Sequence, residues 1–200
     1  MNYICKCPKS DFSKHNFTYW EDRKTTSDEL EIIDFLENSY KLESKQILHI
    51  GIGNSFFAKK FFKNNHIFGI TISKKEIENA NLLNLSNYKF VLCDKYSKNF
   101  NREFNDKKFD VIVDTNLKSY SCCHESFNFF IENLFNKLNK GGILITSKNG
   151  MRWFKRLKPK LSFNLKKFFY YKLKEVNGNK ENILTTNELK NLSKKYNLEF

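Results

Sequence analysis

The sequence lacks the features of a membrane-spanning or disulfide-stapled protein. No stretch of its 200 residues approaches the roughly 20 apolar residues that a membrane-spanning helix needs. The first residues are polar and contain no apolar run, which argues against a secretory signal. The five cysteines are odd in number and have no repeated spacing, which argues against a disulfide framework. We therefore expect a protein of a reducing, cytoplasmic compartment.

Arginine is also scarce, and this tempers the meaning of the net charge of +13. The chain has 4 Arg against 31 Lys, together with 26 Asn, a bias that AT-rich codons supply whatever the function. Proteins that bind phosphate groups more often use arginine, because its planar guanidinium group matches the phosphate geometry. Ten Lys or Arg and no Asp or Glu fall within residues 148–174, so the rest of the chain carries about +3 (13 − 10).

This basic stretch also contains many aromatic residues and leaves three interpretations open. It binds nucleic acid through phosphates and stacking, it lies on an anionic membrane surface, or it is a solvated insertion whose lysine stems cover apolar surface. Nucleic acid thus remains a candidate partner through residues 148–174, whereas a small molecule is the expected substrate.

What is present is enough apolar material for one packed domain over residues 1–200, since 40% of residues are hydrophobic and 21 are Phe. Short apolar runs alternate with helical patterns, which predicts βαβ units and a mostly parallel sheet with helices on both faces. A first helix opens at Ser27 with Leu30, Ile33, Phe35 and Leu36 as its apolar positions. Strands are expected at 46–50, 66–71, 88–93, 109–114 and 143–146, and helices at 55–63, 74–85, 125–138 and 186–196.

The most informative segment joins the first strand to the next helix and reads Gly51-Ile52-Gly53-Asn54-Ser55. Glycine permits a sharp turn and a close ligand, and the helix that follows offers unpaired N–H groups. Dinucleotide-binding folds usually have a third glycine at the position of Phe56 and an acidic residue at the position of Thr71. A nicotinamide cofactor is therefore disfavoured. A Gly-x-Gly taken alone also occurs in many ordinary turns.

Further pieces appear in a fixed order along the chain: Gly69-Ile70-Thr71-Ile72-Ser73, Leu92-Cys93-Asp94, Phe109–Asp114, Leu138–Ile145 and Thr186-x-Glu188-Leu189. With the glycine segment, this order resembles the class I S-adenosylmethionine-dependent methyltransferases over roughly residues 28–146 and 185–200. The resemblance implies a Rossmann-like fold, S-adenosylmethionine as cofactor, and methyl transfer to an O, N or C nucleophile.

The resemblance also implies a set of cofactor-binding residues: His49, Gly51, Gly53, Ser55, Thr71 and Asp94. Two of them depart from the family, which usually has an acid at His49 near the methionine amino group and at Thr71 near the ribose hydroxyls. The loss is on the order of 1–3 kcal/mol per missing charged acceptor, with Ser73 or Glu76 as candidates to compensate. The alternative to an enzyme is a non-catalytic binding or scaffold protein that has lost efficient turnover.

The loop after the fourth strand is expected to face the transferred methyl group. Asp114, Tyr120 and His124 are the candidates to position or deprotonate the nucleophile. The competing interpretation is that Asp114 caps backbone and that His124 only begins a helix. No metal is expected, because Cys5-x-Cys7 and the adjacent Cys122-Cys123 lack the usual spacing of a structural zinc site.

Three peripheral regions complete the expectations. Residues 1–27 form an N-terminal arm or lid, and residues 147–180 form a basic aromatic insertion. The late strands look incomplete, since 198–200 supplies only the opening of a strand. An unpaired edge at 143–146, or a cover for it, is therefore expected.

Overall fold

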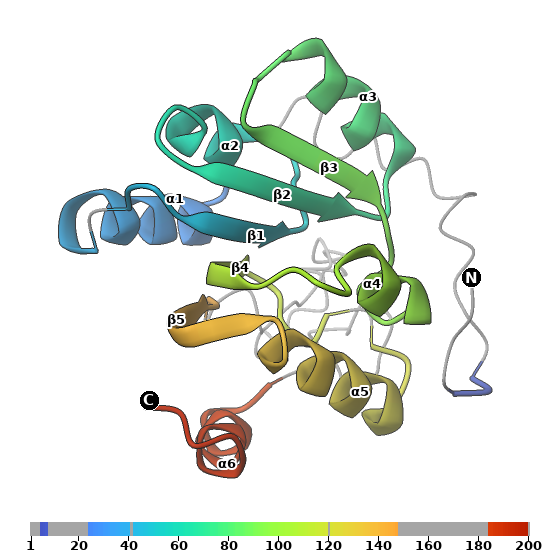
Figure 1. Ribbon diagram of the computed structural model, residues 1–200. Helices are drawn as coiled ribbons and strands as arrows, with labels where there is room; N and C mark the ends of the chain where they lie inside the picture. The colour runs from blue at the N-terminus through green and yellow to red at the C-terminus, as the bar shows by residue number, and fades with distance from the viewer. Residues whose placement is uncertain (1–4, 8–23, 41, 120, 148–183, 200) are drawn as a thin grey trace, which may run out of the picture.

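A computed structural model describes residues 5–7, 24–40, 42–119, 121–147 and 184–199. Its centre is a five-stranded parallel sheet in the order β3-β2-β1-β4-β5 (Figure 1). The strands are β1 (Gln46–Ile50), β2 (His66–Thr71), β3 (Tyr88–Leu92), β4 (Phe109–Asp114) and β5 (Leu138–Ile145). This confirms the predicted α/β fold with a parallel sheet.

Helices connect the strands, and four of those described begin after a residue whose side chain caps them. They are α1 (Ser27–Asp34) with the continuing π-helix η3 (Phe35–Ser39), α2 (Phe56–Phe61), α3 (Lys74–Leu82), α4 (Lys98–Glu103), α5 (His124–Phe135) and α6 (Thr186–Lys195). Ser73 caps α3, because its hydroxyl accepts from the Glu76 N–H at 3.3 Å. The short helix α4 was not predicted.

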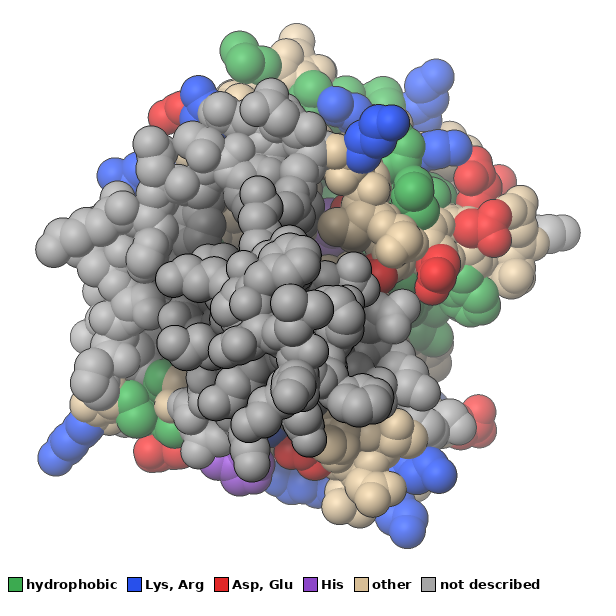
Figure 2. All heavy atoms as spheres, turned by 180° about the vertical axis from the view of Figure 1, so that it is seen from behind, with side chains coloured by type: hydrophobic (Ala, Val, Ile, Leu, Met, Phe, Trp, Pro, Cys, Tyr) green, Lys and Arg blue, Asp and Glu red, His purple; other side chains and the backbone are tan. Residues whose placement is uncertain are grey.

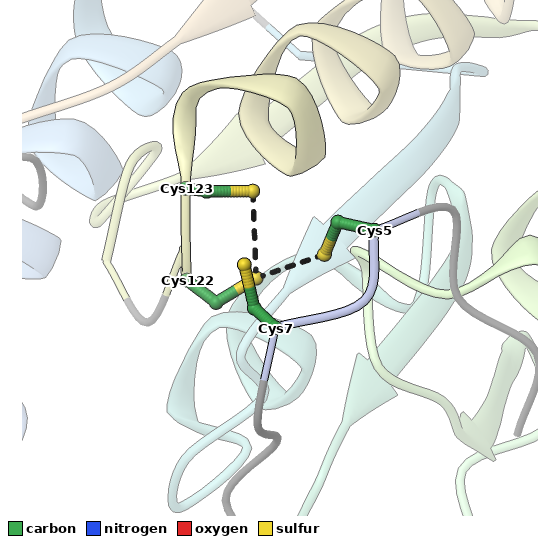
Figure 3. A group of neighbouring side chains, drawn as sticks. All are labelled: Cys5, Cys7, Cys122 and Cys123. Atoms are coloured by element: carbon green, nitrogen blue, oxygen red, sulfur yellow. Dashed lines mark hydrogen bonds between the residues drawn. The ribbon is translucent and has the colours of Figure 1, made fainter.

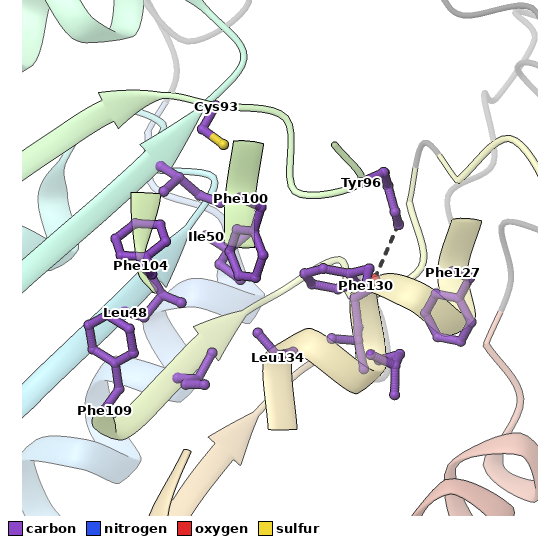
Figure 4. Packing of buried hydrophobic residues seen from close by; sticks show 14 of the residues in the cluster. Leu48, Ile50, Cys93, Tyr96, Phe100, Phe104, Phe109, Phe127, Phe130 and Leu134 are labelled. Atoms are coloured by element: carbon purple, nitrogen blue, oxygen red, sulfur yellow. Dashed lines mark hydrogen bonds between the residues drawn. The ribbon is translucent and has the colours of Figure 1, made fainter. Parts of the chain in front are cut away.

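The sheet is covered on both faces, and the alternation of side chains along each strand divides the core into two halves. Leu48 and Ile112 face α4 and α5, where Phe100, Phe104 and Phe130 pack edge to face (Figure 4). The neighbouring strand residues turn to the other side, where they pack with α1, α2 and α3: Ile47, Ile67, Val111 and Val113. Burial on both faces explains why the strands read as continuous apolar runs.

The first helix buries a different face from the predicted one. Ile32, Ile33 and Leu36 are buried, whereas Leu30 and Phe35 are each 45% exposed. The predicted apolar stripe was therefore wrong at two of its four positions. The π-helical turn after Asp34 widens the winding at this point, so the apolar residues no longer follow one 3.6-residue stripe.

The connection from α5 to the last strand also differs from the prediction. The helix ends at Phe135, and β5 already begins at Leu138, so 139–142 is not the expected turn between helix and strand. Leu138 pairs with Phe109 and Ile143 pairs with Val111, which places an irregular bulge between them. Gly142 is required there, because an added Cβ would lie 3.0 Å from the carbonyl oxygens of Asn139 and Asp110.

The periphery is described only in part. Most of the expected arm (1–27) and insertion (147–180) lies outside the described residues, so these divisions stay predictions. Leu198 and Glu199 lie in no strand, and no described segment pairs with the outer edge of β5. Within the described ranges, no helix is both long and apolar enough to cross a membrane. On the face seen in Figure 2, described lysines and arginines are interspersed with acids.

Candidate active site

The strand order places a topological switch point between β1 and β4, where connecting helices leave toward opposite faces. Open parallel sheets bind ligands at the carboxyl ends of such strands. The registers Ile50 with Ile70, Ile50 with Asp114, and Thr71 with Leu92 bring the ends of four strands to one edge. The predicted residues Gly51, Thr71, Asp94 and Asp114 therefore converge there.

The loop after β1 has an exposed backbone cradle. Gly51 has φ +81° and Gly53 has φ +51°, both in the left-handed region that favours glycine. A Cβ added to either glycine would meet no atom of the described residues within 4 Å, so this part of the structure leaves the space over the loop open. This is the geometry that a ligand in close contact with the backbone needs.

Ser55 contributes to this loop differently from the expectation. It also has a left-handed backbone, with φ +58°, but its side chain is buried and lies 3.2 Å from the Tyr88 hydroxyl. Its N–H donates to the Ile52 carbonyl at 2.8 Å. Ser55 thus fixes the turn through its backbone and links it to β3, and its hydroxyl points into the protein.

A carboxylate is present at the end of β2 although Thr71 stands there. The Thr71 hydroxyl donates to Glu76 Oε2 at 2.6 Å, and its oxygen accepts the Ser73 N–H at 3.0 Å. Burial raises the pKa of Glu76, while hydrogen bonds from Thr71 and from the Gly53 backbone act against that rise. The predicted compensation by Glu76 is thus geometrically available, one turn along α3.

A second carboxyl group approaches the glycine loop from α1. Burial raises the pKa of Glu29 to about 7, a hydrogen bond from the Phe57 backbone opposes the rise, and the nearby Glu76 adds to it. Glu29 Oε1 is buried without a hydrogen-bond partner. An orphaned acceptor beside an open cradle fits a ligand that brings hydroxyl or amino donors.

His49, by contrast, brings no negative charge to the site. Its side chain is 2% exposed and its ring lies 4.6 Å from the Phe57 ring, between centroids. Burial lowers its pKa to about 4, so the imidazole is neutral at pH 7. The position where the family usually has an acid therefore offers only a neutral ring nitrogen.

Asp94 follows β3 and is buried, with 5% exposure. Its Oδ1 accepts the Tyr96 N–H at 2.9 Å, and its carbonyl accepts the Ser97 hydroxyl at 2.8 Å. These contacts hold the carboxylate at the same edge as Thr71 and fix the start of α4.

Asp114, the last residue of β4, is engaged by protein groups at both oxygens. Lys95 Nζ donates to Oδ2 at 2.7 Å, and the Asn116 N–H donates to Oδ1 at 3.0 Å. Lys95 also donates to the carbonyls of Asn116 and Leu117, at 2.8 and 3.2 Å. Asp114 and Lys95 thus brace the loop that was expected to face the methyl acceptor, in accord with the capping interpretation.

The remaining candidates lie on that loop or at its end. Tyr120 lies outside the described residues, and His124 is exposed at the first position of α5. Four cysteines that are distant in the sequence lie close together in the structure. The sulfurs of Cys5, Cys7, Cys122 and Cys123 are all within 4.8 Å of one another. Spacing along the chain, on which the expectation of no metal was based, did not indicate this convergence.

Sequence reasoning missed Lys95, Glu29 and Lys118. Lys118 is buried and pairs with Glu188 of α6 at 2.9 Å, a contact that spans 70 residues. In a chain so rich in lysine, nothing in the pattern distinguishes the two buried lysines from the exposed ones. Glu29 carried a weak signal, since it lies in the first turn of a helix that precedes the glycine strand.

The fold and the site define a class I methyltransferase: a parallel sheet of order 3-2-1-4-5, a glycine cradle after the first strand, and polar residues at the next three strand ends. A family model described as a methyltransferase domain matches residues 41–196. The chain therefore belongs to this methyltransferase family, and it is an enzyme whose cofactor is S-adenosylmethionine.

One solved structure supports the fold, and a second is reported for its similarity alone. The N-methyltransferase NodS from Bradyrhizobium japonicum WM9, in complex with S-adenosyl-L-homocysteine, is 18% identical, with a TM-score of 0.52 over 68% of this chain and 67% of that one. A TehB-like methyltransferase from Corynebacterium glutamicum is 16% identical, with a TM-score of 0.47 over 57% and 60%. Among curated proteins, none matches the sequence.

Proposed function

We propose that the protein transfers a methyl group from S-adenosylmethionine to an O, N or C nucleophile of a small molecule. The observation that carries the proposal is the open backbone cradle at Gly51 and Gly53, which shares one edge with the Thr71–Glu76 pair and Asp94. A bound cofactor supplies an electrophilic methyl carbon on a sulfonium sulfur, and the fold contributes mainly positioning.

Each residue of this edge is expected to contact a different part of the cofactor. Asp94 accepts from the adenine amine, as the family resemblance implies. Thr71 and Glu76 together accept from the ribose hydroxyls, since Glu76 already accepts a hydrogen bond from the Thr71 hydroxyl and brings a carboxyl group to this strand end. His49 lies where the methionine amino group is held, and a neutral imidazole there binds an ammonium group more weakly than a carboxylate does.

On the acceptor side, Asp114 acts as a positioning residue. Its two oxygens are already occupied by Lys95 and the Asn116 backbone, so it holds the following loop and removes no proton. The proton of the nucleophile then passes to a base on the loop. His124 is exposed at the start of α5, and Tyr120 is the other candidate on the loop.

The test is the stabilisation of the folded protein by S-adenosylhomocysteine, because a ligand that binds only the native state raises its Tm. Gly51→Val fills the open space and should abolish that shift, and Asp94→Ala and Glu76→Gln should each weaken it. Gly141→Val is the matched control, since Gly141 also has a positive φ (+77°) and open space around its Cβ, but lies in β5.

The comparison of the two glycines separates ligand exclusion from backbone strain. Both substitutions should lower the Tm of the unliganded protein, and only Gly51→Val should remove the response to ligand. A normal response in Gly51→Val would mean that the loop is an ordinary turn and would overturn the proposed cofactor position.

The basic stretch (148–174) is proposed to contribute to substrate recognition and not to cofactor binding. Converting Lys155, Arg156, Lys158 and Lys160 to Ser should leave the affinity for S-adenosylhomocysteine within a few-fold. A large loss of that affinity would show that the stretch is part of the structure that binds the cofactor. Any RNA binding by the intact protein should fall steeply with salt, and salt-independent or absent binding would remove nucleic acid as a partner.

A further inference from the structure

We propose that Cys5, Cys7, Cys122 and Cys123 form a tetrathiolate site for one zinc ion, which fastens the N-terminal segment to the loop between β4 and α5. The four side chains come from two segments of the chain and turn their sulfurs toward one another (Figure 3). The site uses none of the proposed cofactor-binding residues, so it does not depend on the proposed methyl transfer.

The distances between the sulfurs suit a single metal ion. Cys5 Sγ lies 3.2 Å from Cys122 Sγ, Cys122 Sγ lies 3.9 Å from Cys123 Sγ, and all four sulfurs lie within 4.8 Å. Zinc bound to four thiolates at about 2.3 Å in a tetrahedron sets the sulfurs about 3.8 Å apart. An iron–sulfur cluster spreads its four cysteines over two or four irons, so it needs a wider arrangement than this one.

The fold already orients one of the four sulfurs. Cys123 is the N-cap of α5, a helix of 12 residues, and its sulfur accepts the Ser126 N–H at 3.5 Å. An N–H donor to a metal-bound sulfur fixes the direction of that ligand. The start of α5 therefore holds Cys123 in place for the proposed site.

A disulfide is the competing chemistry for the same sulfurs. It would join two cysteines, and the sulfurs of Cys5 and Cys122 lie 3.2 Å apart, compared with about 2.05 Å in an S–S bond. A single bond between these two leaves the convergence of Cys7 and Cys123 on the same point unexplained. A tetrahedral soft cation accounts for all four, and tetrahedral sulfur ligation selects zinc among the common divalent ions.

A site with four protein ligands has no open coordination position, so the ion is structural. The position of the ion affects the loop between β4 and α5. Cys122 and Cys123 end the segment that begins at Asp114 and is braced there by Lys95. The zinc ion fixes the other end of this segment and holds residues 5–7 against it.

Cobalt(II) substitution of the full-length protein tests the site. Cobalt added to the reduced, metal-free protein should bind with one-to-one stoichiometry and give the intense visible bands and sulfur-to-metal charge transfer of a tetrahedral tetrathiolate. One equivalent of zinc should displace it. Cys5→Ser and Cys122→Ser should each lose that spectrum, and Cys93→Ala should keep it, because Cys93 is buried outside the cluster.

Three results would overturn the proposal. Weak octahedral cobalt bands, or a spectrum unchanged in both serine variants, would place the metal elsewhere. An iron–sulfur absorption in the protein as purified would replace zinc by a cluster. A mass lower by two hydrogens, mapped to Cys5 and Cys122, with no cobalt uptake after reduction, would make the group a redox pair.

Discussion

At the glycine loop, the carboxyl groups of Glu29 and Glu76 are held by neutral donors, whereas beyond β4 the carboxylates of Asp114 and Glu188 each accept from a buried lysine. Burial raises the pKa of both glutamates at the loop. For Glu188, burial also acts upward, but bonds from the Thr185 backbone and Lys118 bring its pKa below the usual value. The two glutamates at the glycine loop thus accept only from neutral groups, whereas the two carboxylates beyond β4 are neutralised by lysines.

The difference separates a binding surface from a scaffold. A carboxylate that lacks a cation gains most when a ligand brings hydroxyl or ammonium donors, which is what a cofactor with a ribose and an amino acid end supplies. A carboxylate already paired with lysine gains nothing further and serves to hold its loop. The comparison therefore assigns ligand binding to the β1–β2 side and loop positioning to the β4–α5 side.

The largest effect is expected on the paired side. Lys95→Met should lower the free energy of unfolding at pH 7 by about 3–5 kcal/mol, because it leaves Asp114 charged, buried and without its cation. Urea denaturation measures this, and the double variant Lys95→Met/Asp114→Asn should recover part of the loss. A cost below about 1 kcal/mol would show that the loop is not organised by this pair.

On the unpaired side, His49 should make the protein sensitive to acid. Its folded pKa of about 4 lies below the ordinary 6.5, so its contribution is fully present above pH 6.5 and is lost as the pH falls through 4. The loss between pH 7 and pH 4 is about 3 kcal/mol at most. His49→Phe should flatten this part of the stability curve, and His66→Phe, at an exposed position, should not.

Glu29 should act in the opposite direction. Its folded pKa of about 7 lies above the ordinary 4.5, so its contribution is fully present below pH 4.5 and is lost as the pH rises through 7. Glu29→Gln should gain stability relative to the parent protein by about 2 kcal/mol between pH 5 and pH 8, after allowance for its partial exposure. Glu31→Gln, exposed on the same helix, should follow the parent at every pH.

The smallest effect belongs to an exposed pair that serves as the reference for both sides. Lys60 and Glu37 lie 3.3 Å apart with side chains 41% and 48% exposed. Lys60→Met should change the free energy of unfolding by no more than about 0.5 kcal/mol in the same urea titration. A larger change would mean that surface charge, and not burial, sets the contrast between the two halves.

The strands and the cofactor edge were predictable because they depend on local patterns. Continuous apolar runs predicted the five strands, and the glycines after β1 predicted the cradle. The ends of elements were less predictable. The bulge in β5 depends on how Asp110 and Asn139 meet across two strands, at 2.8 Å, and nothing in either segment alone indicates it.

Side-chain partners across long separations could not be predicted for the same reason. The convergence of Cys5 and Cys122 spans 117 residues, and the linear spacing, which argued against a zinc site, gave no sign of it. The pairing of Lys95 with Asp114 required knowledge of which strand ends are neighbours. Glu76 was named as a candidate to compensate for Thr71, but the hydrogen bond that it accepts from the Thr71 hydroxyl at 2.6 Å is visible only in the structure.

Glu188 has a consequence for the order in which the chain folds. It closes the capping box of α6 with Thr185, and it also accepts from Lys118, 70 residues earlier. The start of the helix and its docking on the β4–α5 loop therefore share one side chain. Contacts of such sequence separation form late. We therefore expect the loop to reach its final conformation only after α6 has docked, so that a helix synthesised later completes a segment made before it.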